Sequence, residues 1–283
     1  FSGVDSLAKL RMLDRVLLER LHHKAERVRA LWSQNHNDWE ETAYQWLAQY
    51  WGGVLNGAPM ARLAKAIPLK ILQKQRDHLF QIEALLFGGS GMLTDTTGAD
   101  TYQVNLAREF RFLATKYQLG DNLLAPHEWK FLRLRPAGFP TVRIAQWAVF
   151  CQVLPSFFST LIEAENPEEL LRLFGVRQSE YWQQHYRFGK QAASRVPALG
   201  KTTAQSLVIN AAVPLMVAYG QERTLPLLTD RAVSWLERLP AEHNSFTRAW
   251  EALDMHVKTA FDSQALIEWQ ASYCGQKKCL ECT

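Results

Sequence analysis

Apolar residues recur three or four positions apart along most of the chain, which is the spacing of an amphipathic α-helix. From Asp5 to Trp32 a leucine-rich stripe repeats at this spacing and predicts one long helix with a charged outer face. Strict two-residue alternation, which is typical of a half-buried strand, is scarce. The pattern therefore predicts an all-α fold, a multi-helix globular bundle of about ten to twelve helices with no substantial sheet.

Capping residues and prolines mark where the helices begin. Asp38, followed by Glu41 three residues later, predicts the start of a helix that ends at Gly52-Gly53. Pro68 is placed to be the first residue of a helix that runs to Phe87. Further starts are predicted at Pro140, at Asn166-Pro167 and at Ser179, with Pro155 breaking the helix that Pro140 opens. Helices are also predicted over 101–118, 202–219, 225–238, 244–256 and 263–272.

A hydrophobic share of 47% with 21% charged residues describes a folded, water-soluble protein and excludes disorder or coiled coil over the whole chain. No fixed repeat or low-complexity linker divides it, so we expect a single all-helical domain over 1–283, with a candidate seam near 120–138. Two stretches without charged residues, 144–162 and 202–221, are long enough to span a membrane. Each contains proline and glutamine, which lipid-facing helices carry at a cost. We interpret both as core helices and expect no membrane partner.

Charge is unevenly spread along the 283 residues, although 32 Lys and Arg against 28 Asp and Glu give a net charge of only +4. The segments 129–162 and 181–221, which we term the first and second acid-free windows, contain no Asp or Glu. If the windows share one surface, that surface attracts phosphate or another polyanion. The alternative is that acids are missing because much of both windows is buried. Their basic residues are Lys130, Arg133, Arg135, Arg143, Arg187, Lys190, Arg195 and Lys201.

The most distinctive polar segment runs from Arg133 to Gln146. Arg135 and Arg143 flank a Pro/Gly turn that leads into a helix start, and Arg143 and Gln146 lie three residues apart on one helix face. Guanidinium groups near a helix N-terminus suit a phosphate or a carboxylate. Alternatively, these arginines pair with buried acids such as Glu83 or Glu109.

The segment Val196–Ala204 resembles the hairpin of helix-hairpin-helix DNA-binding proteins, which contacts phosphate through backbone N–H groups. Ala198 replaces the first glycine of that hairpin, and the second acid-free window has no carboxylate for glycosylase chemistry. Phosphate contact near Lys201 and an ordinary helix cap at Thr202 or Thr203 are both consistent with the sequence.

Cys274, Cys279 and Cys282 crowd into nine residues with the spacing C-x4-C-x2-C. This spacing can hold zinc or an iron–sulfur cluster if a fourth ligand arrives from Cys151, a histidine or sequence outside this chain. A disulfide and free thiols are the alternatives. An odd cluster in a chain otherwise poor in cysteine favours a reducing cytoplasm.

The sequence contains no P-loop, dinucleotide-binding glycine pattern, H-E-x-x-H or G-x-S-x-G motif, and therefore no self-sufficient catalytic motif. Whether the protein is an enzyme stays open. Glu83, Asn210 and Asp262 stand in apolar settings without an obvious local partner. They are candidates for a small-molecule pocket together with Arg135 and Arg143, although such acids more often pair with arginine than catalyse.

Several of these motifs occur together in one order. They are Ile82–Gly88, Arg133–Gln146, Tyr181–Gly189, Ile209-Asn210, Asp262–Ile267 and Tyr273–Cys282. In that order they resemble an uncharacterised bacterial family, domain of unknown function 2851. The resemblance implies a helical architecture but no reaction, because the family has no established activity. Family members are similar in having an additional N-terminal region of mixed β character, reminiscent of metal-dependent nucleases. We expect the chain to be the helical C-terminal part, with that region as its partner.

The leading hypothesis is a helical, polyanion-binding module that associates with nucleic acid or another phosphate-bearing ligand. One alternative is a small-molecule enzyme domain with an Arg/Glu/Asn pocket. Another is a structural helical scaffold with a cysteine metal site at its end. The anion-binding residues of the leading hypothesis are Arg133, Arg135, Arg143, Gln146, Arg187 and Lys201.

Overall fold

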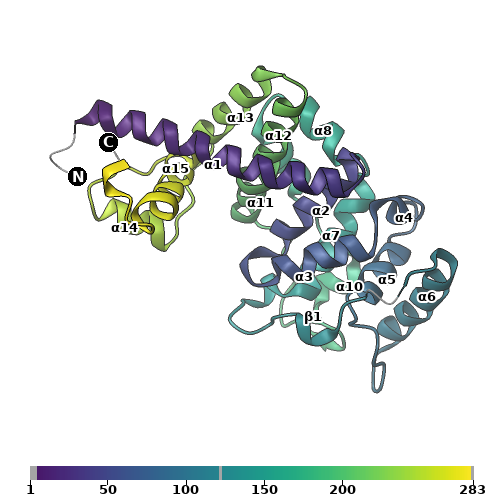
Figure 1. Ribbon diagram of the computed structural model, residues 1–283. Coiled ribbons are helices and arrows are strands. Elements are labelled where there is room, and N and C mark those ends of the chain that lie inside the picture. Colours follow the sequence, from purple (N-terminus) through teal and green to yellow (C-terminus); the bar gives the residue numbers. More distant parts are fainter. Residues whose placement is uncertain (1–4, 121–122, 282–283) are drawn as a thin grey trace. The chain divides into compact units, whose positions relative to one another are not determined.

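A computed structural model describes residues 5–120 and 123–281 of the chain. The all-α prediction is confirmed, because in these ranges the named strands are only β1 (His185–Arg187) and β2 (Lys190–Gln191), which pair antiparallel. The chain divides into two compact units (Figure 1). Unit 1 comprises residues 1–34, 165–167 and 208–283, and unit 2 comprises 35–164 and 168–207. Residues 120–138, the expected seam, lie within unit 2.

Unit 1 is organised around the long N-terminal helix α1 (Ser6–Gln34), which packs against α12 and α15. Part of the predicted leucine stripe forms its buried face, with Leu17, Ala25 and Val28 at most 1% exposed, whereas Leu7 and Leu10 near its start are exposed. Two turns, η3 and η4, are π-helical, a geometry found mostly as single turns inside α-helices. The other elements are η3 (Val208–Ala212), α12 (Val213–Glu222), α13 (Pro226–Arg238), α14 (Ser245–Glu251), α15 (Ala260–Trp269), η4 (Gln270–Cys274) and η5 (Cys279–Glu281).

Unit 2 packs its helices around an aromatic core. Trp51 meets Trp147 and Phe150 with ring centroids 5.1 Å apart in each pair, and Phe174 closes the cluster. Such pairs combine large apolar burial with favourable ring geometry. Its helices are α2 (Trp39–Trp51), α3 (Gly53–Ala66), α4 (Leu69–Gln73), α5 (Leu79–Gly89), α6 (Thr101–Tyr117), η1 (Pro126–Glu128), η2 (Pro136–Gly138), α7 (Pro140–Val153), α8 (Phe157–Glu163), α9 (Pro167–Phe174), α10 (Glu180–Gln184) and α11 (Lys201–Leu207). The first residue of α9, Pro167, is assigned to unit 1.

Most of the predicted helix starts are confirmed. The Asp38 side chain accepts a hydrogen bond from the backbone N–H of Glu41 at 3.1 Å and caps α2. Pro140 is the first residue of α7, and Pro167 the first of α9. The chain breaks around Pro155, where α7 and α8 diverge by 71°. Proline thus marks these boundaries because it fits the first helical turn and disrupts a helix interior.

The predicted helix from Pro68 to Phe87 is wrong, because α4 ends at Gln73 and α5 begins only at Leu79. Residues 74–78 form turns in which the backbone N–H groups of Gln75, Arg76 and His78 donate to the carbonyl three residues back. This stretch is polar and offers no apolar side chain to bury. One of its polar side chains, Gln75, is buried and donates a hydrogen bond to the Tyr117 hydroxyl. Pro68 itself lies just before α4 rather than in it.

One helix among the described residues, Lys201–Glu222, is long and apolar enough to cross a membrane by length and composition. Of its most apolar stretch, 72% is buried inside the protein. The pair α7 and α8 passes the same test only when its 71° bend is ignored.

Candidate anion-binding site

None of the eight basic side chains in the acid-free windows has a carboxylate within 4.0 Å, as far as the described residues go. Seven of them are exposed, and Arg143 is partly exposed. Internal acids therefore do not neutralise these cations. The basic residues of the two windows are thus at least partly exposed to solvent and have no acidic partner among the described residues.

The two windows pack against each other at the start of α7. The guanidinium of Arg187, on β1, lies over the rings of Phe131 and Phe139, 4.4 Å and 4.9 Å from their centroids. The Thr141 hydroxyl, in the first turn of α7, donates a hydrogen bond to the carbonyl oxygen of Tyr186. Cation–π contacts of this kind attract a guanidinium to aromatic rings without neutralising its charge.

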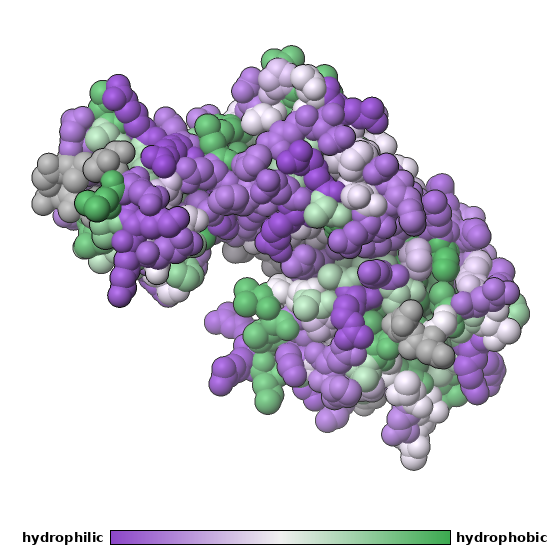
Figure 2. Space-filling view, viewed as in Figure 1, coloured by the Kyte–Doolittle hydropathy of each residue, from purple (hydrophilic) through white to green (hydrophobic). Residues whose placement is uncertain are grey.

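The loop between Phe131 and Phe139 carries two further cations of the first window. Arg133 and Arg135 are exposed, and Arg133 has a left-handed backbone (φ 63°). A residue other than glycine adopts this conformation at a cost of ~1 kcal/mol. Leu132 beside them is 85% exposed. Figure 2 shows hydrophobic side chains flanked by hydrophilic ones at the edge of unit 2 that carries β1. The loop thus presents charge and apolar surface together, next to the stacked Arg187.

Arg143, on α7, has neutral hydrogen-bond partners. Its Nη1 donates to Oε1 of Gln146 at 3.2 Å and its Nη2 to Oγ1 of Thr203 at 3.3 Å. Burial lowers the pKa of Arg143 to about 10, with no charge among the described residues to offset the lost hydration. The two acids considered as internal partners bond elsewhere, Glu83 to two hydroxyls and Glu109 to an amide.

The segment Val196–Ala204, which resembles a helix-hairpin-helix hairpin, has two backbone N–H groups bonded to the rest of unit 2. The N–H groups of Val196 and Leu199 donate to backbone carbonyls outside the segment, at 2.9 Å and 3.2 Å. The carbonyl of Val196 accepts a hydrogen bond from Nε2 of the buried Gln178 at 3.1 Å. These backbone groups are therefore not available to a phosphate. The side chain of Lys201, at the start of α11, is exposed, and phosphate contact near it stays a prediction.

Glu83, on α5, is a buried carboxyl that is 2% exposed. The hydroxyls of Tyr102 and Ser179 donate to its two oxygens, at 2.8 Å and 2.6 Å. Burial raises the pKa of Glu83 to about 7, although both hydrogen bonds act against that shift. Glu83 and Arg143 thus have separate hydrogen-bond partners, and the alternative of a small-molecule pocket that joins them stays a prediction.

Three rings stack beside Glu83. Tyr102 lies on Tyr181 with centroids 3.8 Å apart, and Tyr181 lies on His185 at 4.0 Å. The Tyr181 hydroxyl donates to the carboxylate of Asp100, which also accepts the backbone N–H of Gly189 at 3.1 Å. Burial and the hydrogen bond to Asp100 raise the pKa of Tyr181. The stack thereby ties α6 and α10 to the hairpin that carries Arg187.

Unit 1 contains a buried network that the sequence did not reveal. The Lys24 Nζ lies 2.8 Å from Oδ1 of Asn210 and 3.4 Å from Oε1 of Gln264. Both amides donate in turn to the Glu242 carboxylate, Asn210 at 2.9 Å and 3.0 Å and Gln264 at 2.6 Å. Burial and the nearby Arg20 lower the pKa of Lys24 well below its usual range, although Glu242 opposes the shift.

The position of Lys24 within α1 is a signal that could have revealed this network. Lys24 follows Leu21 by three residues and precedes Val28 by four, so it falls on the apolar stripe of the helix. A charged residue on a buried stripe needs buried partners. Asn210, one of those partners, is the candidate pocket residue of unit 1, and it sits in the π-helical turn η3.

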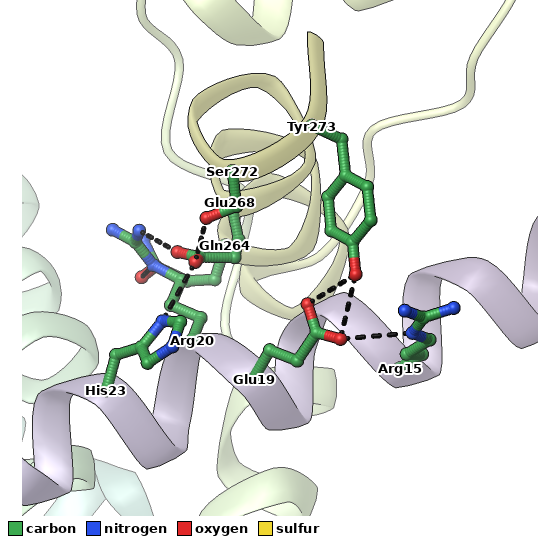
Figure 3. A network of polar contacts seen from close by, with 8 residues as sticks. All are labelled: Arg15, Glu19, Arg20, His23, Gln264, Glu268, Ser272 and Tyr273. Carbon is green, nitrogen blue, oxygen red and sulfur yellow. Dashed lines mark hydrogen bonds and ion pairs between the residues drawn. The ribbon is translucent and has the colours of Figure 1, made fainter. Parts of the chain in front are cut away.

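A second carboxylate, Glu268 on α15, extends the network (Figure 3). Arg20 and His23 on α1 reach its oxygens at 3.3 Å and 3.1 Å, and the Ser272 hydroxyl donates to it at 2.6 Å. Burial disfavours the charge of Glu268, but the hydrogen bond from Ser272 and the charge of Arg20 outweigh it and lower the pKa. Also on α1, Glu19 accepts hydrogen bonds from the Tyr273 hydroxyl at 2.9 Å and from Arg15 at 3.0 Å. These contacts fasten α1 to α15 and η4.

Asp262 caps the start of α15. Its Oδ2 accepts hydrogen bonds from the backbone N–H groups of Lys258 and Thr259, both at 2.9 Å. The structure thus gives this candidate pocket residue a capping role, and sequence reasoning that weighed local capping would have found it.

The cysteine cluster is described only in part, because Cys282 lies outside the described residues. Cys274 and Cys279 are exposed, whereas Cys151 is buried in α7, where burial raises its pKa. Among the residues that the structure describes, no group of three His, Cys, Asp or Glu could hold a metal ion. The zinc or iron–sulfur site stays a prediction.

The fold and these contacts define an all-α protein whose unit 2 carries cations without acidic partners. A family described as a protein of unknown function, DUF2851, matches residues 1–245, and the chain belongs to this family. The helix α15 and the cysteine cluster lie beyond the matched residues. No curated protein matches the chain, and no solved structure does.

Proposed function

We propose that unit 2 binds a phosphate-bearing polyanion, a nucleic acid strand, through the cations of the two acid-free windows. The observation that carries the proposal is that all eight cations lack a carboxylate partner within the described residues while the windows that hold them pack together. Cations that internal acids do not neutralise attract phosphates and release their counterions on binding.

The stacked Arg187 supports the proposal because its position is fixed before any ligand arrives. Its guanidinium lies over the rings of Phe131 and Phe139 and has no carboxylate within 4.0 Å among the described residues, so its N–H donors remain suited to a phosphate. A guanidinium that is already ordered loses less side-chain entropy on binding than a free one. Arg133 and Arg135 on the adjoining loop add two charges to the same region.

A fluorescence-anisotropy titration with labelled single- and double-stranded DNA and RNA at low salt tests this function. The triple variant Arg133→Ala, Arg135→Ala, Arg187→Ala should lose roughly tenfold or more in affinity, because each phosphate contact contributes to binding. The matched control removes three exposed cations of the same unit, on α6, namely Arg108→Ala, Arg111→Ala and Lys116→Ala. It should bind like the wild type. Absence of binding to every nucleic acid at low salt, or an equal loss in the control, would contradict the proposal.

A further inference from the structure

Arg143 differs from the other cations of the acid-free windows in being largely buried. It donates to Gln146 and Thr203, which are both neutral, at 3.2 Å and 3.3 Å. Hydrogen bonds from a guanidinium to a charged oxygen are shorter, at roughly 2.7–2.9 Å. Its two oxygen partners are therefore at distances typical of weak, neutral contacts.

A charge removed from water without an opposite charge raises the free energy of the folded protein, and an anion at that position would lower it again. Lys24, a buried cation of unit 1, is bridged to Glu242 through two amides. Arg143 has no such carboxylate within the described residues. Arg143 and Thr203 both remain partly exposed, which is the condition for an anion to reach them from solvent.

We propose that Arg143 and Thr203 form a subsite for a single phosphate group, either the terminal phosphate of a nucleic acid strand or free phosphate. The inference rests on the proposed function and adds recognition of a strand end to it. The guanidinium donates two N–H groups to phosphate oxygens, and the Thr203 hydroxyl donates to a third. Lys201, exposed two residues before Thr203, supplies a second positive charge nearby.

The limited exposure of Arg143 is the reason for choosing a terminal phosphate. A phosphate inside a strand carries a nucleoside on each side, and both would have to pass the residues that surround the guanidinium. A terminal phosphate is bulky on one side only and carries a second negative charge near neutral pH, since its second pKa is about 6.

The test compares one single-stranded oligonucleotide with a 5′-phosphate, with a 3′-phosphate or with hydroxyls at both ends. The wild type should bind one phosphorylated form roughly tenfold or more tighter than the hydroxyl form, as expected for charge-assisted hydrogen bonds. Arg143→Gln should abolish that preference. Thr203→Val, which keeps the side-chain shape, should weaken it, while Thr202→Val, which removes an exposed neighbouring hydroxyl, should not. Circular dichroism of each variant verifies folding.

Equal affinity for the three oligonucleotides, or a preference that survives Arg143→Gln, would overturn recognition of a strand end by this subsite while leaving the proposed function intact. A thermal-shift titration with inorganic phosphate tests the phosphate subsite independently of nucleic acid binding. If phosphate raises the melting temperature of the wild type but not of Arg143→Gln, the subsite stands even if no oligonucleotide binds. Absence of any such shift together with absence of end preference would refute it.

Discussion

Glu83→Gln removes an ionisation that the fold of unit 2 disfavours. Glu83 is 2% exposed, and its two oxygens accept hydrogen bonds from Tyr102 and Ser179, which are neutral. Burial raises its pKa from 4.5 to about 7. At ~1.4 kcal/mol per pKa unit, this difference corresponds to about 3 kcal/mol between the protonated and the ionised folded states.

The sign of the effect follows from the raised pKa of Glu83. Below pH 4.5 the carboxyl is protonated in both the folded and the unfolded chain, and its contribution to the free energy of unfolding is complete. As the pH rises toward 7 the unfolded chain ionises first, so the folded state loses about 3 kcal/mol of stability. Glutamine cannot ionise, and it can still accept from one hydroxyl and donate to the other. The Glu83→Gln variant should therefore lack this decline.

Urea unfolding at pH values from 5 to 8 measures the decline in both proteins. The difference in unfolding free energy between the variant and the wild type should grow with pH by about 2–3 kcal/mol in favour of the variant. Glu180→Gln, which removes an exposed carboxylate of the same unit, controls for the change in net charge. If the curves of wild type and Glu83→Gln stay parallel across this range, Glu83 does not ionise against its surroundings and the reasoning is refuted.

Substitutions at three further sites test individual contacts within unit 1 or within unit 2 by urea unfolding. Glu242→Ala should lower the free energy of unfolding by ~3–5 kcal/mol, because it leaves Lys24 buried without its bridged carboxylate. Adding Lys24→Met should recover part of this loss, whereas fully additive effects of the two substitutions would contradict the bridge. Gly88→Ala places a Cβ 2.0 Å from the ring of Phe110 and should cost ~1–3 kcal/mol, whereas an unchanged midpoint would exclude that contact. Asn244→Ala removes the cap of α14 and should cost ~1 kcal/mol, while Asn244→Asp should not.

Local patterns predicted the elements well where one residue decides a boundary. Asp38 and Pro140 sit where the sequence places them, because capping and proline geometry act over a few residues. Ser179 shows the limit of such reasoning. It occupies the start of α10 as predicted, but its hydroxyl bonds to Glu83, 96 residues away, instead of capping the helix. A contact of that sequence separation leaves no trace in the local pattern.

The candidate site shows the same difference between local patterns, which the sequence reveals, and contacts between distant segments, which it does not. The absence of acids around the basic residues is visible in the sequence, and it drew attention to Arg143 and Arg187. Whether these cations meet internal acids depends on tertiary packing, and a choice between pairing and ligand binding was not possible from spacing alone. The contact of Arg187 with the rings of Phe131 and Phe139 joins two segments that are separate in sequence. The position of Lys24 on an apolar stripe indicates that it needs buried partners, but the sequence does not identify them, because they come from distant parts of the chain.

The salt dependence of nucleic acid binding tests the central claim most directly. If Arg133, Arg135 and Arg187 each neutralise one phosphate of a single strand, the logarithm of the association constant should fall with the logarithm of salt concentration, with a slope of about −2 or steeper. The slope of the triple alanine variant should be shallower by about 2. Binding that does not depend on salt, or an equal slope in wild type and variant, would contradict the account.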